Sequence, residues 1–213
     1  MTRFDLSSAL AALSPGRPLV VVDADEVILG FLEGFESFLA AHDLYLDLTS
    51  YRLHGNVKRL EDRTAVLDVE VTALLDEFRH DLDSLDAVPG ACEALAKLSR
   101  MASIVVLSNI SEAHAPARRH NLLSLGLDYP LIANSGLKGS AVATLAARAR
   151  ATSFFVDDIP QHLASAAELT PAVQTVHLVG NPRLKGLLPI PFHANCVAAD
   201  WAAAEAFITA HLT

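Results

Sequence analysis

Short apolar runs recur along the 213-residue chain, each bounded by residues typical of turns. Four are clear and two are weaker; the clear ones are 18–23, 103–108, 153–157 and 175–179, and the weaker ones are 130–133 and 194–197. Helical patterns lie between them, at 91–100, 112–124, 139–149, 160–169 and 201–212. Strands that are apolar at every position and alternate with helices indicate a parallel sheet buried on both faces. The sequence therefore predicts a doubly wound, Rossmann-like α/β sheet, which binds ligands at the carboxyl ends of its strands.

The alternation is interrupted between residues 29 and 86, where two amphipathic helical patterns follow one another without a strand. The first carries Phe31, Leu32, Phe35, Phe38 and Leu39, and the second carries Leu60, Leu67, Val71, Leu74, Leu75, Phe78 and Leu82. Such spacing is typical of a helix face that packs against a core. We therefore expect an α/β core formed by residues 1–28 and 87–213, with a small all-helical unit, 29–86, inserted after the first strand.

Charge and hydropathy narrow the range of partners. The net charge of -9 and the absence of a long basic run argue against nucleic acid or an anionic membrane as the main partner. No uninterrupted apolar stretch approaches the ~20 residues of a membrane span. Asp5 and two serines stand where a secretory signal would have its apolar centre. Cys92 and Cys196 lack metal-like spacing, so we expect free thiols in a cytoplasmic protein.

The first apolar run ends in two carboxylates, Asp23 and Asp25. Side chains two residues apart in an extended chain point to the same face. Two charges about 5 Å apart at an effective dielectric near 20 repel by roughly 3 kcal/mol. A proton, a basic side chain or a metal ion must therefore neutralise them.

Polar residues also end two of the other clear strands. Ser108 and Asn109 follow the second run, Asp157 and Asp158 follow a later one, and Lys138 lies between them, just before a predicted helix. Singly, these residues have ordinary explanations as turn caps, helix caps or a solvated lysine. Because the carboxyl ends of parallel strands meet at one edge of a sheet, we expect them to converge there with the first two acids.

The converging residues support phosphoryl transfer. Carboxylates from two strand ends are ligands suited to Mg²⁺. An aspartate beside that ion can attack phosphorus, and a second carboxyl can protonate the leaving oxygen and then deprotonate a water. A lysine and a hydroxyl donor would hold the phosphoryl oxygens. Asp23 and Asp25 are thus a coherent catalytic pair acting on a small phosphorylated metabolite.

Four segments resemble, in order, the four motifs of the haloacid dehalogenase superfamily. They are "VVVDADEV", "VVLSN", "LKGS" and "FFVDD", and the resemblance spans about residues 18 to 180. It implies that Asp23 is the nucleophile and Asp25 the general acid/base. It also implies that the Asp23 carboxylate and the Asp25 backbone carbonyl bind Mg²⁺.

The resemblance assigns roles to the remaining motif residues as well. Ser108 and Lys138, with Asn109 beside them, would bind the transferring phosphoryl group. The acids Asp157 and Asp158 would complete the metal site, and Asp158 aligns with the most regular acid of the family's fourth motif.

The predicted helical insertion is similar to the family's type-1 cap, which closes over the site and supplies substrate selectivity. Its inter-helix stretch, "YRLHGNVKRLED", is similar to a glycine-containing loop that faces the substrate in some sugar-phosphate mutases of the family. His54, Asn56, Lys58 and Arg59 are therefore possible substrate contacts.

Glu26 departs from the family's pattern, because the phosphatases usually have glycine after the second aspartate. One interpretation is that Glu26 points outward from the loop or caps a helix. The other is that it pairs with a cationic substrate group or with a cap arginine.

Several functions compete at this point. A Mg²⁺-dependent phosphatase is favoured, and a phosphomutase or other phosphotransferase shares all its core residues. A 2-haloacid dehalogenase needs neither Asp25 nor the pair Asp157 and Asp158. A phospho-accepting receiver module would place its acidic pair on the first strand and its acceptor aspartate on a middle strand, whereas here the middle strand ends in Ser108 and Asn109. The sequence does not indicate an oligomeric state.

Overall fold

The six apolar runs form one parallel sheet. The computed structural model describes residues 4–212, so the first three residues of the N-terminal stretch considered above lie outside it. The strands are β1 (Leu19–Val22), β4 (Ser103–Asn109), β5 (Leu131–Asn134), β6 (Ser153–Asp157), β7 (Gln174–Leu178) and β8 (Cys196–Ala198). Their order is β5-β4-β1-β6-β7-β8, which confirms the predicted sheet and places β1 where the direction of strand addition reverses. The carboxyl end of such a strand is where doubly wound sheets bind ligands.

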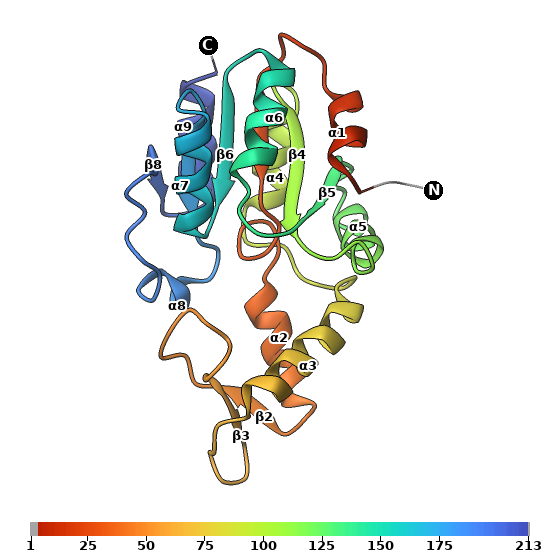
Figure 1. Ribbon diagram of the computed structural model, residues 1–213, viewed down its shortest axis with the longest axis vertical. Helices are drawn as coiled ribbons and strands as arrows, with labels where there is room; N and C mark the ends of the chain where they lie inside the picture. Colours follow the sequence, from red (N-terminus) through yellow and green to blue (C-terminus); the bar gives the residue numbers. More distant parts are fainter. Residues whose placement is uncertain (1–3, 213) are drawn as a thin grey trace.

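Helices cover both faces of the sheet (Figure 1). One face packs against α4 (Ala91–Leu98), α5 (Ala115–Ser124) and α9 (Trp201–Ala210), and the other against α1 (Leu6–Ala12), α6 (Gly139–Ala149) and α7 (Pro160–Leu169). In β1, Val20 and Val22 belong to the first hydrophobic cluster, and Leu19 and Val21 to the second. Because both faces are covered, every position of the strand must be apolar.

Two short helices were not predicted from the sequence, α1 and α8 (Pro182–Lys185). The first turn of α1 is stabilised by Asp5, whose carboxylate accepts a hydrogen bond from the Ser8 N–H at 2.8 Å. Seven and four residues are too few to show helical periodicity. Among the described helices, none is long and apolar enough to cross a membrane.

The insertion after β1 lies beyond the carboxyl ends of the strands (Figure 1). It contains α2 (Phe31–Ala40), β2 (Leu44–Leu46), β3 (Val57–Arg59), α3 (Asp68–Phe78) and the 3-10 turn η1 (Arg79–Asp81). The expectation that the insertion is all-helical is therefore wrong, because β2 and β3 pair as an antiparallel hairpin. Buried Leu44 and Leu46 alternate with Tyr45, but three residues are too short for this alternation to be recognised.

The second helix of the insertion is also shorter than expected. It begins at Asp68, so Leu60 and Leu67 lie outside it and are 62% and 64% exposed. The remaining stripe packs as predicted, because the ring of Phe78 lies 5.2 Å from that of Phe31 and 5.3 Å from that of Phe35. These rings belong to the same hydrophobic cluster as one face of the sheet, so the insertion extends the core.

Candidate active site

The register of the sheet brings the acids of the first and fourth motifs together. Val22 of β1 pairs with Val156 of β6, so the next residues, Asp23 and Asp157, stand level at neighbouring strand ends. Carboxylate oxygens of Asp23, Asp157 and Asp158 lie within 4.8 Å of one another, and all three residues are buried. Residues more than 130 positions apart thus form one acidic cluster at the carboxyl edge.

Lys138 lies inside this cluster. It precedes the first residue of α6, and its Nζ lies 2.7 Å from Asp23 Oδ1 and 2.8 Å from Asp157 Oδ2. Burial acts to lower the pKa of the Lys138 ammonium, but the charges of Asp157 and Asp23 outweigh it and raise that pKa above its usual value. Lys138 therefore stays protonated and holds the two strand ends together.

The cluster keeps an excess of negative charge, since three carboxylates surround one ammonium. Burial is the largest cause that raises the pKa of Asp23 to about 7, with Lys138 opposing it. Burial, followed by the charge of Asp157, also raises the pKa of Asp158. Buried carboxylates that lack sufficient positive charge suit a metal ion with a preference for oxygen ligands.

The two fourth-motif acids differ in their surroundings. Asp157 Oδ2 accepts from Lys138, and its Oδ1 accepts from the Ile159 N–H at 2.9 Å. Asp158 lines a pocket of about 260 Å³ together with Asp23, whereas Asp157 is not among its lining residues. Asp157 thus anchors Lys138, and Asp158 is better placed to reach a metal ion.

Asp25 faces the same pocket, and its carboxylate accepts a hydrogen bond from Arg118 Nη2 at 2.5 Å. Arg118 lies on α5 and is fully buried, and among the described residues its Nε and Nη1 have no hydrogen-bond partner. The sequence analysis missed this residue, because Arg118 and Arg119 look alike as a pair of solvated arginines on a helix. The contact fixes the side chain of the predicted acid/base.

The second-motif residues differ from one another. The hydroxyl of Ser108 is buried and has no hydrogen-bond partner among residues 4–212, but Ser108 does not line the pocket. Asn109 lines it, and its side chain is held by Asn134 Nδ2 at 2.7 Å and by the carbonyl oxygen of Gly136 at 3.0 Å. A buried hydroxyl without a partner requires an explanation, and a bound anion would provide one.

His162, a second residue that the sequence analysis missed, also lines the pocket. Its Nε2 lies 3.3 Å from Asn109 Nδ2. Burial, helped by the charge of Lys138, lowers the pKa of His162 to about 4, so the imidazole is neutral near pH 7. Nothing in the helical sequence around it distinguishes this histidine from a surface one.

Glu26 caps a helix, one of the two interpretations considered from the sequence. Its Oε1 accepts from the N–H of Leu32, in the first turn of α2, at 2.6 Å. The residue has φ +57°, a left-handed conformation that costs a non-glycine residue about 1–2 kcal/mol. Burial is the main cause that raises its pKa to about 7. Glu26 thus connects the first-motif loop to the start of the insertion.

The structure does not bring the four possible insertion contacts to this pocket. Each has a partner within the insertion instead: His54 with Thr72, Lys58 with Asp47, Arg59 with Glu70, and Asn56 with the carbonyl oxygens of Ser50 and Arg52. Tyr51 and Leu53, from the same segment, line the pocket in their place.

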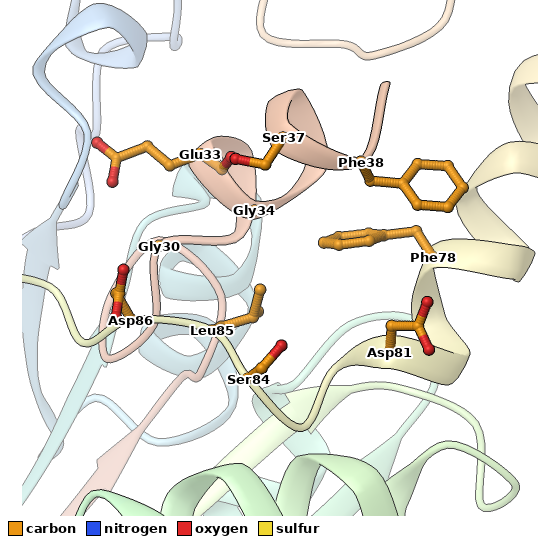
Figure 2. A pocket seen from close by; sticks show the side chains of 10 residues that line it. All are labelled: Gly30, Glu33, Gly34, Ser37, Phe38, Phe78, Asp81, Ser84, Leu85 and Asp86. Carbon is orange, nitrogen blue, oxygen red and sulfur yellow. The ribbon is translucent and has the colours of Figure 1, made fainter. Parts of the chain in front are cut away.

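A second pocket, of about 340 Å³, lies where the chain enters and leaves the insertion (Figure 2). Its lining consists of Gly30, Glu33, Gly34, Ser37, Phe38, Phe78, Asp81, Ser84, Leu85 and Asp86. Three carboxylates border it, Glu33 from α2 and Asp81 and Asp86 from the stretch that leaves the insertion, but none of the motif residues does. Although this pocket is larger, the chemistry predicted from the sequence belongs to the smaller one.

Comparison with known proteins supports the fold. No family model and no curated protein sequence matches the chain. Among solved structures, a haloacid dehalogenase-like protein from Agrobacterium tumefaciens is 16% identical, with a TM-score of 0.61 over 92% of this chain and 99% of that one. A HAD family hydrolase from Deinococcus radiodurans, with bound phosphate and sodium, is 17% identical, with a TM-score of 0.59 over 93% of this chain and 98% of that one.

An L-2-haloacid dehalogenase is similarly close in fold, at 11% identity and a TM-score of 0.61 over 92% of this chain and 100% of that one. At such identities the likeness concerns the fold, including an insertion after β1, and not the reaction. The protein therefore has the fold of the haloacid dehalogenase-like hydrolases, with a buried acidic cluster at the carboxyl edge of its sheet.

Proposed function

We propose that the protein is a Mg²⁺-dependent phosphatase that hydrolyses a small phosphorylated metabolite through an aspartyl-phosphate intermediate. The observation that carries the proposal is the buried arrangement of Asp23, Lys138 and Asp157, with Asp158 and Asp25 on the same pocket. The groups proposed as nucleophile, phosphate-binding cation and proton-transfer group thus lie within one small volume.

The contacts of Asp23 indicate which atom attacks. Its Oδ1 accepts from Lys138 and from the Ala24 N–H at 2.7 Å, which leaves Oδ2 to form the bond to phosphorus. The bond from phosphorus to the leaving oxygen breaks, and Asp25 gives that oxygen a proton. Asp25 then takes a proton from a water, whose oxygen attacks phosphorus and releases Asp23.

The positive groups would balance the charge of the transferring phosphoryl group. Lys138 would hold its oxygens, with Asn109 and the unpartnered hydroxyl of Ser108 nearby. Asp23, Asp158 and the backbone carbonyl of Asp25 would hold Mg²⁺, which supplies charge neutralisation when bound.

Two alternatives on the same fold are less well supported. Dehalogenation of a 2-haloacid needs neither Asp25 nor the fourth-motif acids, yet Asp25 and Asp158 both line the pocket. A phosphomutase would share every core residue, but the insertion residues compared with the loop of such mutases are engaged elsewhere, as with Lys58 and Asp47.

Hydrolysis of p-nitrophenyl phosphate tests the proposal. We expect turnover with Mg²⁺, loss of turnover in EDTA and its recovery when Mg²⁺ is restored. Asp23→Asn should abolish the reaction, while Asp62→Asn, the same change at an exposed site, should not. Turnover that survives in Asp23→Asn or in EDTA would contradict the mechanism, and metal-independent release of chloride from 2-chloropropionate would favour the dehalogenase.

A further inference from the structure

The pocket has a second half that the proposed chemistry does not use. Away from the motif residues and His162, its wall is largely apolar and consists of Phe31, Leu32, Tyr51, Leu53, Ile159 and Leu184. These residues come from α2, from the segment between β2 and β3, and from two segments of the sheet domain. A phosphoryl group held at Lys138 would therefore place its leaving group against this wall.

Positive charge is confined to the phosphoryl end. Lys138 is the single lysine or arginine that lines the pocket among the residues described, and two carboxylates already hold it. Arg183, just before the apolar Leu184, is turned to Glu36, which accepts two hydrogen bonds from its Nη1 at 2.8 and 2.7 Å. Lys185 donates to the Ala199 carbonyl oxygen at 2.6 Å. A second anionic group on a substrate would find no free cation here.

The other charged residues that line the pocket are acidic. Asp25, whose charge is paired with Arg118, and Glu26 both line it, together with the buried Asp23 and Asp158. A carboxylate or second phosphate on the leaving group would lose its hydration on entry and face these acids without compensation. The charges that line the pocket thus disfavour the binding of such substrates.

We infer, on the basis of the proposed function, that the substrate is a phosphate monoester whose leaving group is small, uncharged and largely apolar. A short alkyl or aryl alcohol fits the wall of aliphatic and aromatic side chains. Bisphosphates and phosphorylated carboxylic acids do not fit it.

Three alkyl monophosphates of similar length test the inference on the unaltered protein. They are n-butyl phosphate, 3-carboxypropyl phosphate and 4-aminobutyl phosphate, which differ mainly in terminal charge. We expect kcat/KM with Mg²⁺ to be at least about tenfold higher for the butyl ester than for the other two. Equal or higher kcat/KM for the carboxylate would overturn the inference. A preference for the ammonium ester would also overturn it, because it would assign a cationic leaving group facing Glu26.

A charge introduced into the wall tests whether these side chains contact the leaving group. Leu53→Lys should raise the ratio of kcat/KM for 3-carboxypropyl phosphate to kcat/KM for n-butyl phosphate by about tenfold. Leu60→Lys, the same change at a residue that is 62% exposed and outside the pocket, is the control and should leave the ratio unchanged. An unchanged ratio in Leu53→Lys would refute the assigned wall. p-Nitrophenyl phosphate separates the two proposals. If neither it nor the alkyl esters are hydrolysed, the proposed function fails. If it is hydrolysed but the alkyl esters do not show the expected order, only the inferred specificity fails.

Discussion

Two lysines show how differently the sheet domain and the insertion use charge. Lys138, at the sheet edge, has a side chain that is 1% exposed and lies between carboxylates from two strands. Lys58, on the hairpin of the insertion, has a side chain that is 28% exposed and pairs with Asp47, which is itself 46% exposed. In both cases an ammonium meets carboxylate, but the surroundings give the pairs different consequences.

The difference is one of solvation. Burying a charge costs several kcal/mol, which is recovered only if its partner is well placed, so the loss of one partner is severe. An exposed pair is already hydrated, and its loss is mild. The sheet domain therefore concentrates buried charge at one edge, while the insertion uses charge to hold its hairpin and presents mainly apolar side chains to the pocket.

The largest expected effect is that of Lys138→Met, which leaves Asp23 and Asp157 buried without their cation. We expect the free energy of unfolding to fall by about 3–5 kcal/mol. The proposed phosphatase activity should be lost as well, since Lys138 would no longer hold the phosphoryl oxygens. Urea denaturation and p-nitrophenyl phosphate turnover measure the two effects.

Lys97→Met is the matched control, because Lys97 is paired with Glu205 but its side chain is 58% exposed. It should behave like the unaltered protein in both measurements. If the free energy of unfolding of Lys138→Met is close to that of Lys97→Met, the expected difference between buried and exposed ion pairs is contradicted.

A smaller effect is expected for Arg118→Leu, which removes the contact that fixes Asp25. A poorly positioned general acid matters most when the leaving group is a poor one, because such a group needs a proton as it departs. We expect kcat/KM to fall about tenfold or more for n-butyl phosphate and less for p-nitrophenyl phosphate. Equal losses on both esters would indicate that Arg118 only stabilises the fold.

Much of the sheet could be predicted because its signals are local. A strand such as Leu19–Val22 is apolar at each position, and the acids that follow it mark its carboxyl end. The hairpin of the insertion gave no such signal, since each of its strands has three residues. The spacing of Leu60 fits a helix, yet the chain there continues from β3.

The partners of charged side chains could not be predicted, because they depend on residues far apart in the chain. Asp25 meets Arg118 across 93 positions, and no pattern distinguishes Arg118 from its neighbour Arg119. Glu26 shows the same limit, since helix capping and a cationic partner fit its sequence equally well. Spacing thus indicates which residues share a sheet edge, and packing decides what each of them contacts.

The smallest expected effect is that of Lys58→Met, which tests the other side of the comparison. Lys58 lies outside the pocket, and its hydrogen bond to Asp47 raises its pKa, so the charge is engaged within the insertion. We expect kcat/KM for n-butyl, 3-carboxypropyl and p-nitrophenyl phosphate to be unchanged, and the unfolding midpoint to move little, as for exposed ion pairs in general. A selective loss on 3-carboxypropyl phosphate would show that Lys58 leaves Asp47 to meet the substrate. The insertion would then contribute charge to recognition, and the apolar wall could not be its main means of selecting a leaving group.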